Sequence, residues 1–225
     1  MSRKVFFVTG TDTGVGKTHA SVALLQALAA QGRTTLGLKP VAAGCDATTD
    51  GLRNEDALAL QAAATVKLPY AQVNPVALAE AIAPHIAAAH EKRRIGVTQL
   101  AGLVRGALMQ GRADVTLIEG AGGWRVPLNE RETLADLARE LDVPVILVVG
   151  VRLGCISHAL LTAEAIRRDG RVLAGWVANA IDATMPAREE NIATLRAALG
   201  APLLGVLPHG PADASAWPGI AALLD

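Results

Sequence analysis

The sequence predicts an α/β fold, a mostly parallel β-sheet with helices on both faces, in a single domain over residues 1–225. Short apolar runs bounded by Gly, Pro or Asn recur at wide intervals, which is typical of strands. Ala- and Leu-rich stretches with helical spacing lie between them. The runs are continuously apolar, as expected for a parallel sheet covered on both faces. A chain of this length is ordinarily one α/β domain.

Six short strands are expected, at residues 4–8, 34–38, 115–120, 143–149, 172–179 and 202–207. Helices are expected over residues 18–31, ending at Gly32, over 157–169, ending at Gly170, and over a stretch that begins after Asn54. Residues 66–94 contain Pro75 and Pro84 within a helical pattern. This segment is therefore interpreted as an insertion over the strand ends.

Composition excludes several classes of protein. The chain is 51% hydrophobic and 19% charged, the balance of a well-packed globular protein. The formal net charge is zero, and the basic run at 91–94 is interpreted as a solvated helix end, so no nucleic-acid partner is expected. The apolar run at 143–151 is far short of the roughly 20 residues that span a bilayer, so no membrane segment is expected.

The start of the chain and its cysteines indicate a reducing compartment. The sequence MSRKVFFVTG turns directly into a strand and a Gly-rich loop without a cleavage site for a signal peptide. Cys45 and Cys155 have no metal-binding spacing and are expected to be free thiols. The predicted location is the cytoplasm.

Residues 8–20, VTGTDTGVGKTHA, resemble a phosphate-binding loop with one departure. The usual pattern requires Gly at position 11, where this chain has Thr11, and Gly10 is one residue too early. Gly14, Gly16, Lys17 and Thr18 nevertheless supply backbone N–H groups, a lysine for the terminal phosphates and a hydroxyl for Mg²⁺. The alternative is a Gly-rich turn with an exposed lysine, but the position between a strand and a helix favours a P-loop NTPase-like fold.

Other polar residues follow the predicted strands, where ligands of parallel sheets bind. Lys39, held beside Pro40, is either an ordinary surface lysine or part of a nucleotide site, and Glu119, followed by GAGG, is either a solvated carboxylate or a metal neighbour. Asp56 lies in a predicted first helical turn, where an acid favours the helix dipole, and the residues alone favour that interpretation. Asn179 ends a strand and is a possible turn former.

Further blocks occur in order along the chain, including KPVAAG (39–44), GLRNEDALALQ (51–61), EGAGGWRVPL (119–128) and VPVILVVGVRLGCISHALLT (143–162). Together with the loop, in which Thr at position 11 is then normal, they resemble the dethiobiotin synthetases up to about residue 210. The resemblance implies an ATP- and Mg²⁺-dependent enzyme. It forms a carbamate from CO₂ and 7,8-diaminononanoate, phosphorylates the carbamate, and closes the ring to dethiobiotin with release of ADP and phosphate.

The resemblance also implies roles for individual residues. Lys17 and Lys39 are catalytic, Thr18, Asp56 and Glu119 hold Mg²⁺, and Asn179 reads adenine. His19 is expected to contribute only its backbone N–H, while His85 and His90 cover helix surface. The predicted nucleotide-binding residues are Gly14, Val15, Gly16, Lys17, Thr18, His19, Asp56, Glu119, Gly120, Ala121, Gly122, Asn179 and Pro208.

Substrate contacts are implied at Thr11, Lys39, Ala43, Gly122, Gly123, Cys155 and Ser157. The family often has Ser at position 43 and Asn at position 157. Ala43 has no side-chain donor, so a contact there comes from the backbone or is absent. In the family the segment containing Cys155 and Ser157 comes from the neighbouring subunit, which implies a homodimer with shared active sites. The backbone donors of residues 154–157 at a helix N-terminus suit the substrate carboxylate.

Two rival functions share the predicted fold. One is a nucleotide switch of the partition or metal-chaperone type, but the partition-type ATPases carry a signature lysine where this chain has Asp12. The other is an amide-forming synthase of the cobalamin pathway, but 225 residues leave no room for a glutamine-hydrolysing domain.

Overall fold

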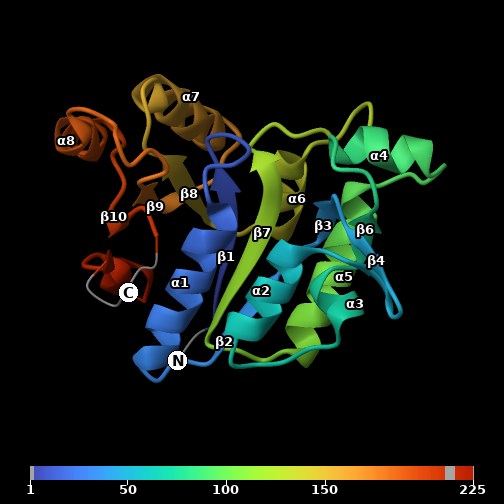
Figure 1. The fold of residues 1–225 in the computed structure, drawn as a ribbon. Helices are drawn as coiled ribbons and strands as arrows, with labels where there is room; N and C mark the ends of the chain where they lie inside the picture. Colours follow the sequence, from blue (N-terminus) through green and yellow to red (C-terminus); the bar gives the residue numbers. More distant parts are fainter. Residues whose placement is uncertain (1–2, 211–215, 225) are drawn as a thin grey trace.

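The computed structural model describes residues 3–210 and 216–224. A six-stranded sheet forms its centre, in the order β10-β9-β8-β1-β7-β2 with every neighbouring pair parallel (Figure 1). All six predicted strands are present. They are β1 (Lys4–Gly10), β2 (Thr35–Leu38), β7 (Val115–Gly123), β8 (Val145–Gly150), β9 (Leu173–Asn179) and β10 (Leu203–Leu207).

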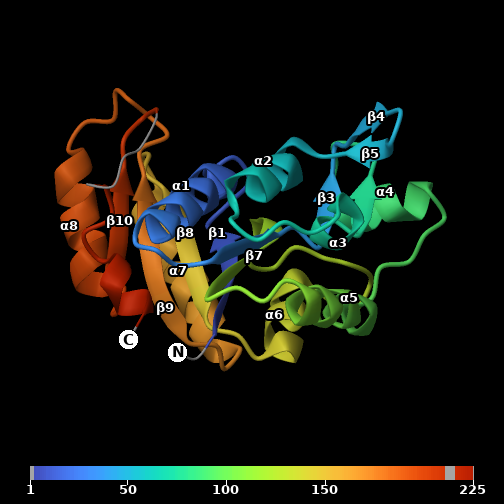
Figure 2. The same cartoon turned by 90° about the horizontal axis from the view of Figure 1, so that it is seen from below.

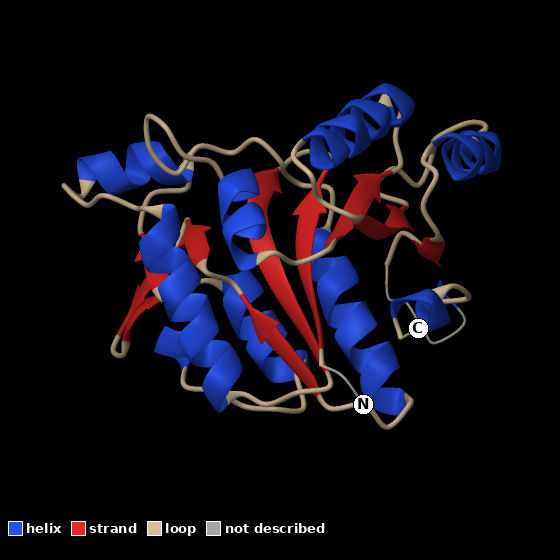
Figure 3. Cartoon of the chain, turned by 180° about the vertical axis from the view of Figure 1, so that it is seen from behind, coloured by secondary structure: helices blue, strands red, loops and turns tan. Residues whose placement is uncertain are grey.

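Helices cover both faces of this sheet, as the sequence predicts (Figures 2 and 3). Side chains alternate along β1, so that Phe6 and Val8 join one apolar cluster and Phe7 joins the other. Helix α1 (Lys17–Ala30) and the 3-10 helix η2 (Ile220–Leu223) pack on the first face. The second face is covered by α5 (Val97–Gln110), α6 (Leu134–Leu141), α7 (Cys155–Arg168) and α8 (Arg188–Ala198).

Three helices have the predicted capping residues. Helix α2 (Glu55–Ala63) begins after Asn54, whose side chain accepts a hydrogen bond from the Ala57 N–H at 3.2 Å. Helices α1 and α7 end shortly before Gly32 and Gly170, which have φ of 77° and 72°. These left-handed conformations favour glycine and terminate a helix.

The segment 66–94 is broken at Pro75 and Pro84. Pro75 precedes β6 (Val76–Leu78), Pro84 occupies the first turn of α4 (Pro84–His90), and α3 (Tyr70–Val73) is a single turn. Strand β6 pairs with β3 (Val41–Ala43) in a small separate sheet, and β4 (Asp46–Thr48) with β5 (Gly51–Arg53) forms a hairpin. The segment that was predicted as an insertion over the strand ends is thus an ordered extension beside the central sheet (Figure 1).

Candidate active site

The loop between β1 and α1 has the shape of a phosphate-binding loop. Gly14 and Gly16 have φ of 75° and 79°, and a Cβ on Gly16 would lie 2.1 Å from Nδ2 of Asn179. That Nδ2 donates to the Val15 carbonyl at 2.9 Å, so the end of β9 fixes the loop. Thr11 needs no left-handed backbone, and its N–H donates to the Val148 carbonyl at 3.1 Å. This explains why glycine is not required at position 11.

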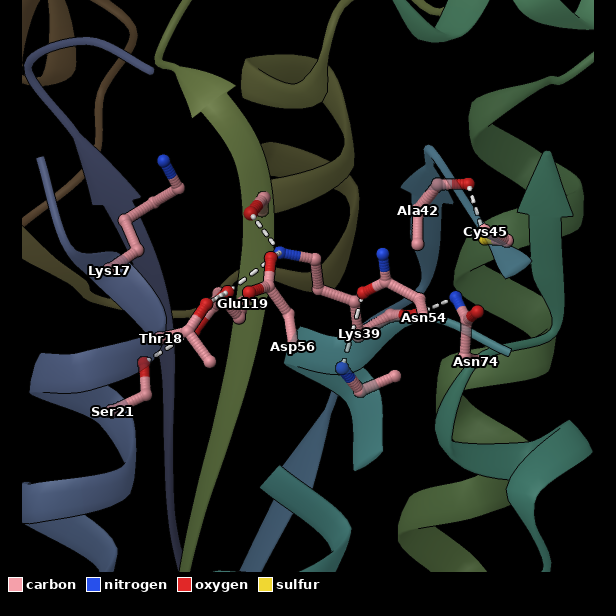
Figure 4. Close-up of polar contacts among 12 residues, drawn as sticks. Lys17, Thr18, Ser21, Lys39, Ala42, Cys45, Asn54, Asp56, Asn74 and Glu119 are labelled. Atoms are coloured by element: carbon pink, nitrogen blue, oxygen red, sulfur yellow. Dashed lines mark hydrogen bonds and ion pairs between the residues drawn. The ribbon is translucent and has the colours of Figure 1, made fainter. Parts of the chain in front are cut away.

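Lys39 lies directly after β2 and is buried between two carboxylates (Figure 4). Its ammonium is 2.7 Å from Oε1 of Glu119 and 2.8 Å from Oδ2 of Asp56. Glu119 is fully buried inside β7, which runs on to Gly123 instead of ending at residue 120 as predicted. The alternatives of a surface lysine and a solvated strand-end carboxylate are therefore wrong. Asp56 does lie in the first turn of α2, but its carboxylate is directed at Lys39.

Two hydroxyls from α1 complete the surroundings of Glu119. Thr18 donates to Oε1 at 2.7 Å, and Ser21 donates to Oε2 at 2.8 Å. Ser21 is fully buried and was not predicted as a site residue. Its signal in the sequence is its spacing of one helical turn from Thr18 in an otherwise Ala- and Leu-rich helix.

The charges of the two lysines respond differently to this environment. Burial, helped by repulsion from Lys39, lowers the pKa of Lys17 to about 8. Burial also lowers the pKa of Lys39, but attraction by Glu119 and Asp56 outweighs this effect and raises that pKa above its usual value. Burial raises the pKa of the Asp56 carboxyl, but attraction by Lys39 outweighs this effect and holds that pKa below its ordinary value. Lys39 is therefore a fixed cation at neutral pH.

A chain of hydrogen bonds from the segment 66–94 supports Lys39. The Asn74 amide donates to the Lys39 carbonyl at 2.7 Å, and the Tyr70 hydroxyl donates to Oδ1 of Asn74 at 3.0 Å. The backbone N–H of Asn54 donates in turn to the Tyr70 hydroxyl at 2.7 Å. The sequence did not reveal Asn74 and Tyr70, because only the pairing of β3 with β6 brings them next to Lys39.

The site opens onto a cavity of about 790 Å³, a size that suits a small-molecule site. Its wall includes both lysines, Thr18 and Asp56, and it also contains the predicted substrate positions Ala43 and Gly122. Apolar side chains complete the wall. The lining residues are Thr13, Gly14, Gly16, Lys17, Thr18, Lys39, Ala42, Ala43, Asn54, Asp56, Ala81, Ile82, Ala83, Pro84, Ala121, Gly122, Arg125, Val126 and Pro127.

A second cavity, of about 410 Å³, lies at the ends of β9 and β10. The predicted nucleotide residues His19, Asn179 and Pro208 line it together. The structure thus brings them together at the far side of the phosphate loop from Lys39. The contribution of His19 through its backbone N–H alone stays a prediction.

Four predicted substrate residues lie outside the wall of the large cavity. Gly123 pairs with Gly10 in the sheet, and Thr11 bonds to β8. Cys155 is buried and free, like Cys45, whereas Ser157 is exposed in the first turn of α7. The roles of Cys155 and Ser157 remain predictions about a site shared with a neighbouring subunit.

The two helix-surface histidines and the basic run also have defined positions. His90 is exposed at the end of α4, where its Nδ1 is 2.9 Å from Oε1 of Glu80. His85, also on α4, is partly buried. The run at 91–94 directly follows α4, and Arg93 pairs with Glu91 at 2.9 Å. This agrees with a solvated helix end.

Replacing Ser21 by Ala is expected to lower the free energy of unfolding by about 1–3 kcal/mol, because Oε2 of the buried Glu119 loses its donor. Denaturant unfolding would measure this loss. Thr194→Ala is the matched control, since that exposed hydroxyl only donates to the Glu190 carbonyl within α8. Equal and small losses in both variants would contradict a role for Ser21 in holding Glu119.

Comparison with known proteins identifies the family. A family model described as an AAA domain matches residues 4–214. The ATP-dependent dethiobiotin synthetase BioD of Cellvibrio japonicus is 61% identical over 229 residues, covering 100% of both chains. The protein of the same name from Marinobacter nauticus is 58% identical, covering 92% of this chain and 89% of the relative. This chain belongs to the ATP-dependent dethiobiotin synthetase family.

Membership of the dethiobiotin synthetase family confirms the resemblance in the sequence and makes the chain an enzyme, which decides against a nucleotide switch. Among solved structures, MinD from Pyrococcus horikoshii, complexed with Mg-ADP, has a TM-score of 0.56. It is 20% identical, and the match covers 94% of this chain and 83% of MinD, which shows a shared fold. No helix in the described part of the chain is long and apolar enough to cross a membrane.

Proposed function

We propose that the chain closes the ureido ring of dethiobiotin from 7,8-diaminononanoate, CO₂ and ATP in the cytoplasm. Family membership supports the overall reaction. One structural observation carries the proposal for the site. The Lys39 ammonium is held between Asp56 and Glu119 in the same cavity as the phosphate loop, so a fixed cation faces the place where a phosphoryl group would be transferred.

The reaction needs no protein nucleophile. One substrate amine attacks CO₂ and loses a proton to form a carbamate, and a carbamate oxygen then attacks the γ-phosphorus of ATP, expelling ADP. The second amine attacks the carbonyl carbon of this carbamic-phosphoric anhydride and loses a proton, and phosphate leaves as the ring closes. Each step builds negative charge on oxygen, so the enzyme contributes positioning and charge stabilisation.

Lys17 and Lys39 supply that stabilisation in this proposal. Lys17 at the start of α1 reaches the terminal phosphates, as the lysine of a phosphate loop does. Lys39, which lines the same cavity, neutralises the carbamate and the phosphoryl group in transfer. Gly122, with φ of 65°, leaves room for the substrate to approach the backbone.

The oxygen atoms of Thr18, Asp56 and Glu119 fit a magnesium ion. All are hard donors, and the carboxylates of Asp56 and Glu119 already converge on a single cation, the Lys39 ammonium. Among the described residues, no group of three or more His, Cys, Asp and Glu could hold a metal. We therefore assign a site completed by nucleotide phosphates, in which Mg²⁺ would neutralise phosphate charge.

The proposed enzyme is a homodimer whose active sites are shared. Leu153, which is 91% exposed, and Leu161, which is 62% exposed, place apolar surface at the start of α7 beside Ser157. The backbone N–H groups of Gly154, Ile156 and Ser157 lie at the N-terminus of a 14-residue helix and favour an anion, whereas the Cys155 N–H donates to the Arg152 carbonyl at 3.0 Å. This end of α7 would bind the substrate carboxylate in the neighbouring subunit.

We expect ATP hydrolysis to depend on both substrates. Omitting either diaminononanoate or bicarbonate should lower ADP release at least about 100-fold, because no acceptor then faces the γ-phosphate. A coupled ADP assay would measure this, with dethiobiotin quantified by mass spectrometry. Equal turnover without the diamine would refute the proposed function.

A further inference from the structure

Asp169, at the C-terminal end of α7, holds two consecutive residues, the buried Trp124 and Arg125, which lines the large cavity. Its Oδ2 accepts a hydrogen bond from Nε1 of Trp124 at 2.7 Å, and its Oδ1 accepts one from the Arg125 guanidinium at 2.8 Å. Asp169 lies 45 positions after Trp124 and 44 positions after Arg125 in the chain. Both carboxylate oxygens are thus used to attach the segment after β7 to α7.

Trp124 is well suited to anchor this segment. It is 3% exposed, and its ring meets Phe7 of β1 edge to face, with 6.2 Å between the ring centroids. A buried indole N–H needs an acceptor, and a carboxylate is a strong one. The Asp169 side chain is itself only 11% exposed, whereas Arg125 is 53% exposed, so the bond to Trp124 is the better shielded of the two from water.

The anchored segment continues directly from β7, the strand that carries Glu119. Residues 120–123 have no side chain larger than a methyl group, and Gly122 adopts φ of 65°. The first side chain after Glu119 that can fix the backbone is therefore Trp124. Residues 125–127 then line the large cavity. The position of this wall depends on where Trp124 and Arg125 are held.

We propose that Asp169 is a positioning residue for the diamine side of the active site. By attaching Trp124 and Arg125 to α7, it fixes the wall at residues 125–127 and keeps the Arg125 guanidinium paired beside the cavity. The phosphate loop is held separately by Asn179 and α1, so nucleotide binding does not depend on Asp169. This inference rests on the proposed function for the identity of the diamine.

The test compares Asp169→Asn with the control Asp142→Asn. Asp142, at the C-terminal end of α6, pairs with Arg171 near the same end of α7 but does not touch the cavity wall. Asp169→Asn is expected to raise the KM for diaminononanoate about tenfold while the KM for ATP stays within twofold. Asp142→Asn should change neither KM by more than twofold.

A second variant and a spectroscopic measurement exclude a general loss of structure. Trp124→Phe keeps the apolar ring and removes only the indole N–H, so it should raise the same KM by a smaller factor. In ¹⁵N-labelled protein without ligands, it identifies the Trp124 indole resonance, which Asp169→Asn should shift. Equal increases in both KM values, or unchanged KM values with a shifted resonance, would overturn the proposal. Absence of dethiobiotin from the wild-type reaction would instead refute the proposed function and leave the indole measurement intact.

Discussion

Replacing Lys39 by Met is expected to lower kcat for dethiobiotin formation roughly 1,000-fold. The variant removes the fixed cation that faces the transferred phosphoryl group, whereas Lys17 and the phosphate loop remain to bind ATP. The ATP dissociation constant, measured by calorimetry, should therefore change much less than kcat. Lys67→Met is the control, because that exposed lysine only donates to carbonyls at the end of α2.

The same variant should also be less stable than the wild type, because it breaks the buried ion pair between Lys39 and Glu119. Glu119 is fully buried, and without Lys39 its charge has no cationic partner within hydrogen-bond distance among the residues that the structure describes. Breaking a buried pair in this way costs about 3–5 kcal/mol. Thermal unfolding should show this loss, and Mg²⁺ should restore stability more in the variant than in the wild type, because the metal also binds carboxylates. A kcat within tenfold of the wild type would contradict the role of Lys39.

Mixing two inactive variants is expected to restore about a quarter of wild-type activity if the active sites are shared. The variants are Lys39→Ala and Ser157→Asp, the second chosen to repel the substrate carboxylate. Random pairing makes half of the dimers mixed, and each mixed dimer contains one intact site and one site with both defects. The measurement is dethiobiotin formation by the whole mixture after subunit exchange, and two affinity tags are used to show that mixed dimers are present.

A mixture of Lys39→Ala with wild-type chains is the control, and it should retain about half of wild-type activity. It shows that subunit exchange does not damage an intact site. No recovery in the first mixture, with mixed dimers present, would mean either that Lys39 and Ser157 serve one site within one chain or that the start of α7 does not hold the substrate carboxylate.

The sequence was sufficient to predict the central sheet, because parallel buried strands are marked by continuous apolar runs between amphipathic helices. It also located the polar residues at the strand ends, since those ends meet at one edge of the sheet. It did not reveal β3 to β6, each of three residues, which are too short to carry a pattern. Ser21 and Asn74 were missed because their roles come from contacts 98 and 35 positions away in the chain.

Asp56 shows where local and tertiary information differ. An acid in the first turn of a helix is adequately explained by the helix dipole, so the residues alone favoured that explanation. The structure adds a partner 17 positions away, Lys39, at 2.8 Å. Only the packing of α2 against the end of β2 could supply this second reason for an aspartate at that position.

The bond from Asn179 to Val15 has a consequence for the order in which the enzyme becomes functional during synthesis. It joins the phosphate loop to a residue 164 positions later, at the end of the fifth strand in chain order of the central sheet. A nascent chain that has not yet emerged through β9 lacks the side chain that holds the loop carbonyl. The chain therefore becomes able to hold a nucleotide late in its synthesis, because this ability depends on the assembled sheet and not on the glycine-rich loop alone.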